Sequence, residues 1–108
     1  MSTFKTSSII DVYKMIKSVS RKYFASFNQI VLNRNNVCKD SEEEIEFLTK
    51  VEIAYNELSD EGKRFINSEF FFNEPKGWWI GYYSRSQFFK LKKKYSLEFM
   101  RNLNIYVF

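Results

Sequence analysis

The residue types that carry out most enzyme chemistry are scarce in this chain. It contains no histidine and a single cysteine, Cys38. The absence of histidine removes the commonest general base, the commonest transition-metal ligand and every Ser-His or Cys-His pair. One cysteine allows neither an internal disulfide nor a thiolate metal cluster. We therefore expect no enzyme activity, no cofactor and no metal site, and we interpret Cys38 as a small, partly buried side chain.

Carboxylates are the remaining candidates for catalysis, and they cluster in the run from Glu42 to Glu46. Paired carboxylates suit a metal ion or acid/base chemistry, but no His, Cys or Asp-x-Asp calcium loop accompanies them. Ser41, with Glu44 three residues later, has the spacing of a capping box. The run is therefore interpreted as the start of a helix, where the helix dipole favours negative charge.

Basic residues point to a different kind of chemistry, the binding of a polyanion. Residues 1–39 carry seven Lys/Arg against one acid, residues 40–75 carry three against eleven, and residues 76–108 carry seven against one. The middle is acidic and both ends are basic. The densest basic stretch is "GYYSRSQFFKLKKKYSLEFM", residues 81–100, which is either a solvated helix or a surface that reads a partner.

The elements that must position these residues are predicted to be helices. Apolar side chains recur every three or four residues, which predicts an all-α fold. The first and longest helix follows Ser7 or Ser8, ends near Asn33 to Asn36, and has on its stripe Ile9, Val12, Ile16, Val19, Tyr23, Phe27, Ile30 and Val31. That stripe is either core or the seam of a homodimer. A second helix begins at Ser41, with Ile45, Leu48, Val51, Tyr55 and Leu58 on its inner face.

Three further elements are predicted in the second half of the chain. Ser59 caps a third helix that contains Phe65, Ile66 and Phe70. Asn73 then caps a short helix, "EPKGWWI", that starts at Pro75 and ends at Gly81. Ser84 caps a last long helix whose inner stripe is Phe88, Leu91, Tyr95, Phe99 and Leu103, and the closing "NIYVF" is prone to form β-structure. We expect one compact unit in which residues 1–39 form the amphipathic helix and residues 40–108 form the rest.

A short helix, a tight turn and a long helix make the layout of a helix-turn-helix. With Phe88 facing inward, Gln87, Lys90, Lys93, Lys94, Leu97 and Arg101 fall on the outer side of the last helix. Arg85 and Ser86 lie at its N-terminal tip. In a helix-turn-helix the tip enters the major groove of double-stranded DNA, and lysines further along neutralise phosphates.

Residues 54–103, "AYNELSDEGKRFINSEFFFNEPKGWWIGYYSRSQFFKLKKKYSLEFMRNL", resemble the C-terminal domain with which sigma factors read the promoter −35 element. They are most similar to the small phage ArpU-type late transcription regulators, which share a "YSRSxFYRLKKKALxEF"-like ending. The resemblance implies a sigma-like DNA-binding transcription regulator of a bacterium or phage. It places Ser84 at the cap, Phe88 and Leu91 in the core, and at the groove Arg85, Ser86, Gln87, Phe89 and Lys90.

The chain departs from that family in two places. "KGWWIGYY" replaces an acidic or polar helix, and Tyr95 and Ser96 follow the last lysine where the family has Ala-Leu. We interpret Trp78, Trp79 and Tyr82 as candidate partner-binding residues and expect at least one tryptophan in the core. The alternative function is therefore a module that docks on RNA polymerase or a sigma factor through Phe70 to Tyr83 without contacting DNA. The sequence has no uncharged apolar run long enough to span a membrane and no signal-peptide pattern at its start, which predicts a cytoplasmic protein that does not bind membranes.

Overall fold

The computed structural model describes residues 8–32, 39–72 and 74–104. Its elements follow one another as α1 (Ile9–Leu32), α2 (Lys39–Asn56), α3 (Asp60–Ile66), the π-helix η1 (Asn67–Phe71) and α4 (Arg85–Asn102). No strand occurs among these residues, so the prediction of a small all-α fold with a long N-terminal helix is confirmed. Cys38, Asn73 and the end of "NIYVF" lie outside the described residues.

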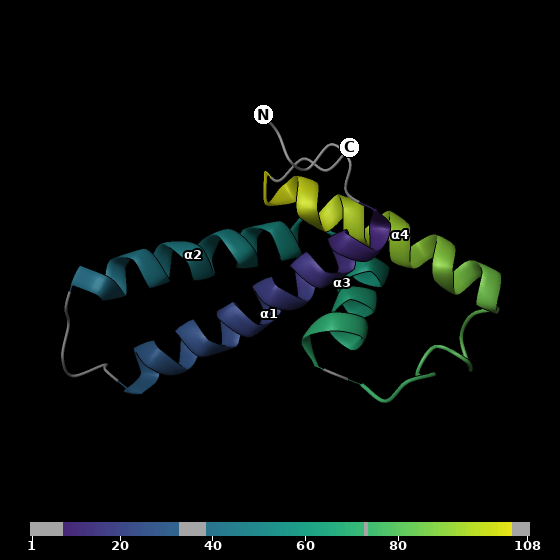
Figure 1. The fold of residues 1–108 in the computed structure, drawn as a ribbon, viewed down its shortest axis with the longest axis horizontal. Coiled ribbons are helices and arrows are strands. Elements are labelled where there is room, and N and C mark those ends of the chain that lie inside the picture. The colour runs from purple at the N-terminus through teal and green to yellow at the C-terminus, as the bar shows by residue number, and fades with distance from the viewer. Residues whose placement is uncertain (1–7, 33–38, 73, 105–108) are drawn as a thin grey trace.

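The two longest helices of the first half, α1 and α2, run antiparallel as a hairpin (Figure 1). The phenol of Tyr23 on α1 donates a hydrogen bond of 2.9 Å to Glu52 Oε2 on α2. The ammonium of Lys22 lies 4.4 Å from the centre of the Phe47 ring. α4 crosses the hairpin at the end remote from the α1–α2 connection (Figure 1). At the same end α3 packs against α4, and η1 packs against α1.

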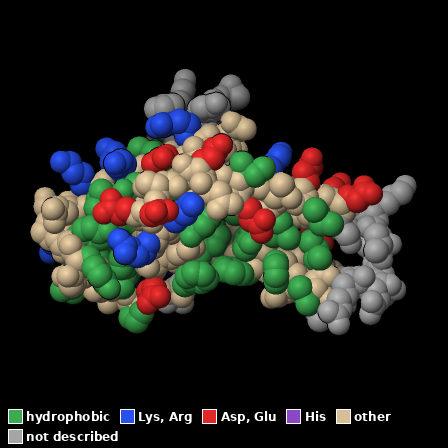
Figure 2. Space-filling view, turned by 180° about the vertical axis from the view of Figure 1, so that it is seen from behind, with side chains coloured by type: hydrophobic (Ala, Val, Ile, Leu, Met, Phe, Trp, Pro, Cys, Tyr) green, Lys and Arg blue, Asp and Glu red, His purple; other side chains and the backbone are tan. Residues whose placement is uncertain are grey.

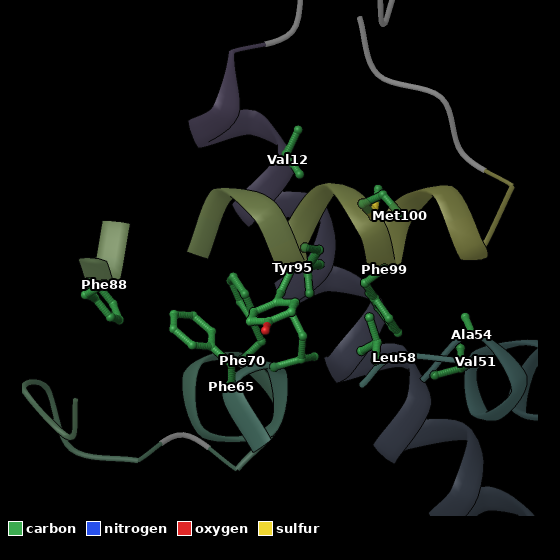
Figure 3. Packing of buried hydrophobic residues seen from close by; sticks show 12 residues of the cluster. Val12, Val51, Ala54, Leu58, Phe65, Phe70, Phe88, Tyr95, Phe99 and Met100 are labelled. Carbon is green, nitrogen blue, oxygen red and sulfur yellow. The ribbon is translucent and has the colours of Figure 1, made fainter. Parts of the chain in front are cut away.

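The core lies where α1, α2, α3, η1 and α4 meet, and all five contribute to it (Figure 3). Its buried members are Val12, Ile16, Val51, Ala54, Leu58, Phe65, Ile66, Phe70, Phe88, Tyr95, Phe99 and Met100. Ile16 is fully buried. The first half of the α1 stripe is therefore core, as the first of the two alternatives for that stripe predicted.

Three of the predicted helix starts can be compared with the structure. Ser8 Oγ accepts a hydrogen bond from Asp11 N at 3.3 Å, and Ser59 Oγ accepts one from Gly62 N at 3.1 Å, which confirms both as caps. Ser41 as an N-cap is wrong, because α2 begins at Lys39 and includes Ser41. A serine is tolerated inside a helix, and the acidic residues that follow still occupy the first turns.

The segment between η1 and α4 is not the short helix that was predicted. Residues 76–82 form successive turns, in which Trp78 N donates to Pro75 O at 3.1 Å and Ile80 N donates to Gly77 O at 3.0 Å. Gly77 has a φ of 84°, a left-handed conformation that side-chain-bearing residues rarely adopt. This residue interrupts the helical path, and the described residues 74–84 lead into α4 as turns and irregular backbone.

Some residues of the predicted inner faces are exposed. Phe27 and Val31 on α1 are each 47% exposed, and Ile45 on α2 is 50% exposed. All three belong to the parts of α1 and α2 that are nearest the α1–α2 connection. Figure 1 shows α3 and α4 at the opposite end of the hairpin. The spacing of these residues correctly predicted which side of each helix they lie on, but no described residue covers that side near the α1–α2 connection.

Candidate nucleic-acid interface

The start of α4 is fixed by the side chains of Ser84 and Gln87. Gln87 N donates to Ser84 Oγ at 3.2 Å, and Ser84 N donates to Gln87 Oε1 at 3.0 Å, which is a complete capping box. Ser84 is therefore the cap that the sequence predicted. Because the amide oxygen of Gln87 belongs to this box, reading a base with both ends of that amide would require the cap to open.

The outer side of α4 carries cationic side chains on successive turns. All five cationic residues predicted to contact DNA are exposed: Arg85, Lys90, Lys93, Lys94 and Arg101. Glu98, the acid of this helix, is half-buried. On the face shown in Figure 2, Lys and Arg side chains lie mostly over the part of the molecule that contains α4, with acidic side chains between them. The charge of the face is therefore mixed, while α4 itself presents a basic side.

Arg85, Ser86 and Phe89 lie together at the first turns of α4, and all three are exposed. The Arg85 Cζ atom is 6.0 Å from the centre of the Phe89 ring, and Phe89 is 49% exposed. Phe89 also meets the buried Phe88 ring edge-on at 5.1 Å. A planar donor group and an apolar ring are thus presented side by side to solvent.

Glu61 connects α3 to both the turn segment and α4. Its carboxylate accepts hydrogen bonds from Tyr95 Oη at 2.5 Å and from Tyr83 Oη at 3.0 Å, and these two bonds lower the pKa of Glu61. The charges of Lys94 and Arg64 lower it further. Burial, followed by the bond to Glu61, raises the pKa of Tyr95 to about 12. This network ties the end of the turn segment, at Tyr83, and the second half of α4, at Tyr95, to α3.

A glycine in α3 lets the Tyr95 ring approach closely. A Cβ atom added to Gly62 would lie 2.9 Å from Tyr95 Cδ1. Any larger residue at position 62 would therefore push the ring, and with it α4, away from α3.

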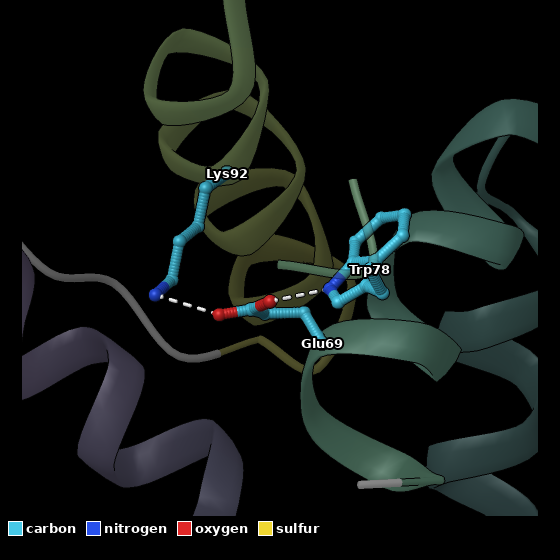
Figure 4. A network of polar contacts seen from close by, with 3 residues as sticks. All are labelled: Glu69, Trp78 and Lys92. Atoms are coloured by element: carbon cyan, nitrogen blue, oxygen red, sulfur yellow. Dashed lines mark hydrogen bonds and ion pairs between the residues drawn. The ribbon is translucent and has the colours of Figure 1, made fainter. Parts of the chain in front are cut away.

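Lys92 is the lysine of the run that points inward. Its Nζ lies 2.8 Å from Glu69 Oε2, and the other oxygen of Glu69 accepts a hydrogen bond of 2.8 Å from Trp78 Nε1 (Figure 4). The Lys92 ammonium also lies 4.3 Å from the centre of the Tyr13 ring. Lys92 was not among the residues predicted on the outer side. Its ion pair with Glu69 was not predicted, because it depends on the position of η1.

The aromatic turn segment divides into a packed part and an exposed part. Trp79 stacks on Phe88 with ring centres 4.5 Å apart, and Trp78 meets Phe65 edge-on at 5.3 Å, so both half-buried tryptophans pack against the core. Tyr82 is 71% exposed and Ile80 is 68% exposed. Ile80 was not predicted as a partner-binding residue. The available signal was Gly77, because the faces of residues that follow an interrupting glycine cannot be read from a helical wheel.

The described residues hold no group of three or more His, Cys, Asp or Glu side chains placed to bind a metal ion. In the same part of the chain, every helix is too short or too polar to cross a membrane. Comparisons of the chain with protein-family models, with curated proteins and with solved structures found no match.

Proposed function

We propose that this protein is a DNA-binding transcription regulator that reads double-stranded DNA with α4. The observation that carries the proposal is the exposed row of cations on α4, with the half-buried Glu98 as the acid of the helix. A surface that neutralises phosphates requires such a row, because release of condensed counterions supplies most of the affinity of basic proteins for DNA. The sigma-like sequence pattern supports the same assignment.

Two groups of contacts follow from the geometry of α4. Arg85 stands at the tip of the helix, where a guanidinium can bond two acceptors on a guanine, and Phe89 can meet the methyl group of a thymine. Lys90, Lys93 and Arg101 lie further along the outer side and suit phosphates. Lys94 shares its surroundings with Glu61, so we expect a weaker phosphate contact from it.

The test is a titration of variants on a preferred duplex and a scrambled duplex at several salt concentrations. Arg85→Ala should cost about 1–3 kcal/mol on the preferred sequence and little on the scrambled one. Lys93→Ala should weaken binding to both duplexes alike. It should also reduce the dependence of the binding constant on salt concentration by the equivalent of about one phosphate contact. Lys50→Ala, which removes an exposed lysine from α2, is the matched control and should change neither.

The preferred duplex is obtained by mapping crosslinked genomic sites. A map without enriched sites, or unchanged binding by folded Arg85→Ala and Lys93→Ala, would show that α4 is a solvated helix.

A second candidate function rests on Ile80 and Tyr82, which are the large exposed side chains of the turn segment. Exposed aromatic and aliphatic groups of this kind anchor protein interfaces. In this alternative the segment docks on RNA polymerase or a sigma factor without DNA. Binding would then depend little on salt, would survive nuclease treatment and would be lost in Tyr82→Ala, whereas Lys93→Ala would leave it unchanged.

A homodimer through α1 stays a prediction. Ile16, at the middle of the expected seam, is fully buried in the core of one chain. A dimer that uses α1 would need its exposed apolar side chains near Val31. Sedimentation at increasing protein concentration tests this directly.

A further inference from the structure

An apolar groove lies between α1, α2 and the end of η1, and no residue of α4 lines it. It has a volume of about 390 Å³ and is walled by aromatic side chains, among them Tyr23, Phe24, Tyr55, Phe71 and Phe72. Phe72 is 62% exposed and Phe24 is 37% exposed. A space of this size is at the small end of the range of ligand pockets, and it accommodates one or two large apolar side chains.

The apolar surface continues beyond the groove toward the tip of the hairpin. On α1, Phe27 and Val31 follow Phe24 at intervals of three and four residues, so the three side chains share one side of the helix. On α2, Ile45 precedes the groove residue Glu52 by seven residues and lies on the same side as Glu52. Figure 2 shows hydrophobic side chains gathered around an indentation between this tip and the rest of the molecule.

The two walls of this surface differ in charge. The α1 wall, residues 23–32, has the sequence YFASFNQIVL and contains no charged residue. The α2 wall carries Glu42 and Glu52 in the row of Ile45, with the exposed Glu46 beside it. A ligand that fills the groove must therefore present apolar groups to its floor and positive charge along one edge.

We propose that this groove binds an amphipathic helix of a partner protein that carries Lys or Arg along one edge of its apolar face. Such a helix sets apolar anchors three, four and seven residues apart into a hydrophobic groove. One anchor would enter the space between Phe24 and Phe72, and the next would cover Phe27 and Val31. Its cations would lie opposite Glu42, Glu46 and Glu52.

A second copy of this chain fits the groove less well. Two-fold pairing brings the same surface of both copies together. The α1 wall between residues 23 and 32 offers no cation to the acidic α2 wall of the other copy. Groove-to-groove pairing would therefore set the glutamates of each copy against a wall whose residues 23–32 carry no charge.

The experiment uses the full chain and two labelled synthetic helices, one of Leu and Lys and its charge-reversed twin of Leu and Glu. Fluorescence anisotropy measures binding to the wild type, to Phe72→Ser, to Val31→Ser and to the double variant Glu42→Lys with Glu46→Lys. Ile53→Ser is the matched control, because Ile53 is 54% exposed on α2 but is not among the groove residues. Circular dichroism melting shows that each variant is folded.

The Leu/Lys helix should bind one per chain, and the groove variants and the charge-reversed variant should each weaken it at least about tenfold. The Leu/Glu helix should bind at least about tenfold more weakly, and Ile53→Ser should leave affinity unchanged. Equal binding of both helices, or equal loss in Ile53→Ser, would overturn the proposal. Sedimentation that shows a dimer abolished by Phe72→Ser would overturn it too, because a second copy would then cover the groove.

Discussion

The two halves of α1 have similar apolar periodicity and opposite surroundings. In the first half, Val12 and Ile16 are buried among side chains from the other elements. In the second half, Phe27 and Val31 lie on the continuation of that side and are each 47% exposed. The difference arises because α3, η1 and α4 cover one end of the α1–α2 hairpin and not the other (Figure 1).

This contrast separates two uses of an apolar stripe. At the covered end it forms the core that holds α4 and its cations in place. In the second half of α1 it forms one wall of the groove and the apolar surface that continues toward the tip of the hairpin. A substitution of the same kind should therefore unfold the protein at one end and change only a surface at the other.

The largest expected difference is between Ile16→Asp and Phe27→Asp. An unpaired carboxylate at the fully buried position 16 costs several kcal/mol, which is enough to unfold a domain of this size. Phe27→Asp should leave the free energy of unfolding nearly unchanged. Urea titrations followed by circular dichroism measure both, and a folded Ile16→Asp protein would mean that the first half of α1 is not core.

A second pair tests the same contrast across one helix. Phe88 is 4% exposed and stacks on Phe65 and Trp79, so Phe88→Ala should lower the free energy of unfolding by about 3–5 kcal/mol. The next residue, Phe89, is 49% exposed and packs edge-on against Phe88, so its replacement by Ala should cost only about 1 kcal/mol. Similar losses of unfolding free energy in the two variants would show that another part of the protein covers the outer side of α4.

The tyrosine network at Glu61 should make the covered end sensitive to pH. Because the pKa of Tyr95 is raised to about 12, its contribution to stability is complete below its ordinary pKa of 10.0 and is lost as pH rises toward 12. Glu61 behaves oppositely: its pKa is lowered from 4.5, so its contribution is present above pH 4.5 and is lost as pH falls through the lowered value.

Tyr95→Phe removes one of these hydrogen bonds and should cost about 1–2 kcal/mol at neutral pH. The free energy of unfolding of the variant should also fall less steeply between pH 10 and 12 than that of the wild type. Part of the fall should remain, because the pKa of Tyr83 is raised as well. Thermal melts across both pH ranges test this. If the stability of Tyr95→Phe falls between pH 10 and 12 as steeply as that of the wild type, the ionisation of Tyr95 does not contribute to the loss.

The smallest effect has the opposite sign. Ser96 is fully buried on α4, and its hydroxyl finds no hydrogen-bond partner among the described residues. Ser96→Ala should therefore stabilise the protein by up to about 1 kcal/mol, because a hydroxyl without a partner is removed from the core. The exposed Ser86→Ala is the control and should change little, and a destabilised Ser96→Ala would show that the hydroxyl has a partner in solution.

The sequence by itself determined the all-α fold, the long first helix, the caps Ser59 and Ser84, and a first cap at either Ser7 or Ser8. It also placed Phe88 inside and Lys90, Lys93, Lys94 and Arg101 outside. These features depend on local chemistry, because a cap needs one side chain near its own backbone and a stripe needs only the period of the helix. The same reasoning failed at Ser41 and in residues 75–80, where it took a capping pattern and a proline as sufficient for a helix start.

Only the tertiary structure decided where the core ends. Helical spacing gives the direction of Phe27, Val31 and Ile45 but not whether another element lies opposite them. It likewise could not pair Glu61 with Tyr83 and Tyr95, or Glu69 with Lys92, because each pair joins elements whose separation depends on the packing of all the helices. The groove exists for the same physical reason: η1 ends at Phe71, which lines the groove, and no described element covers the hairpin from there to its tip.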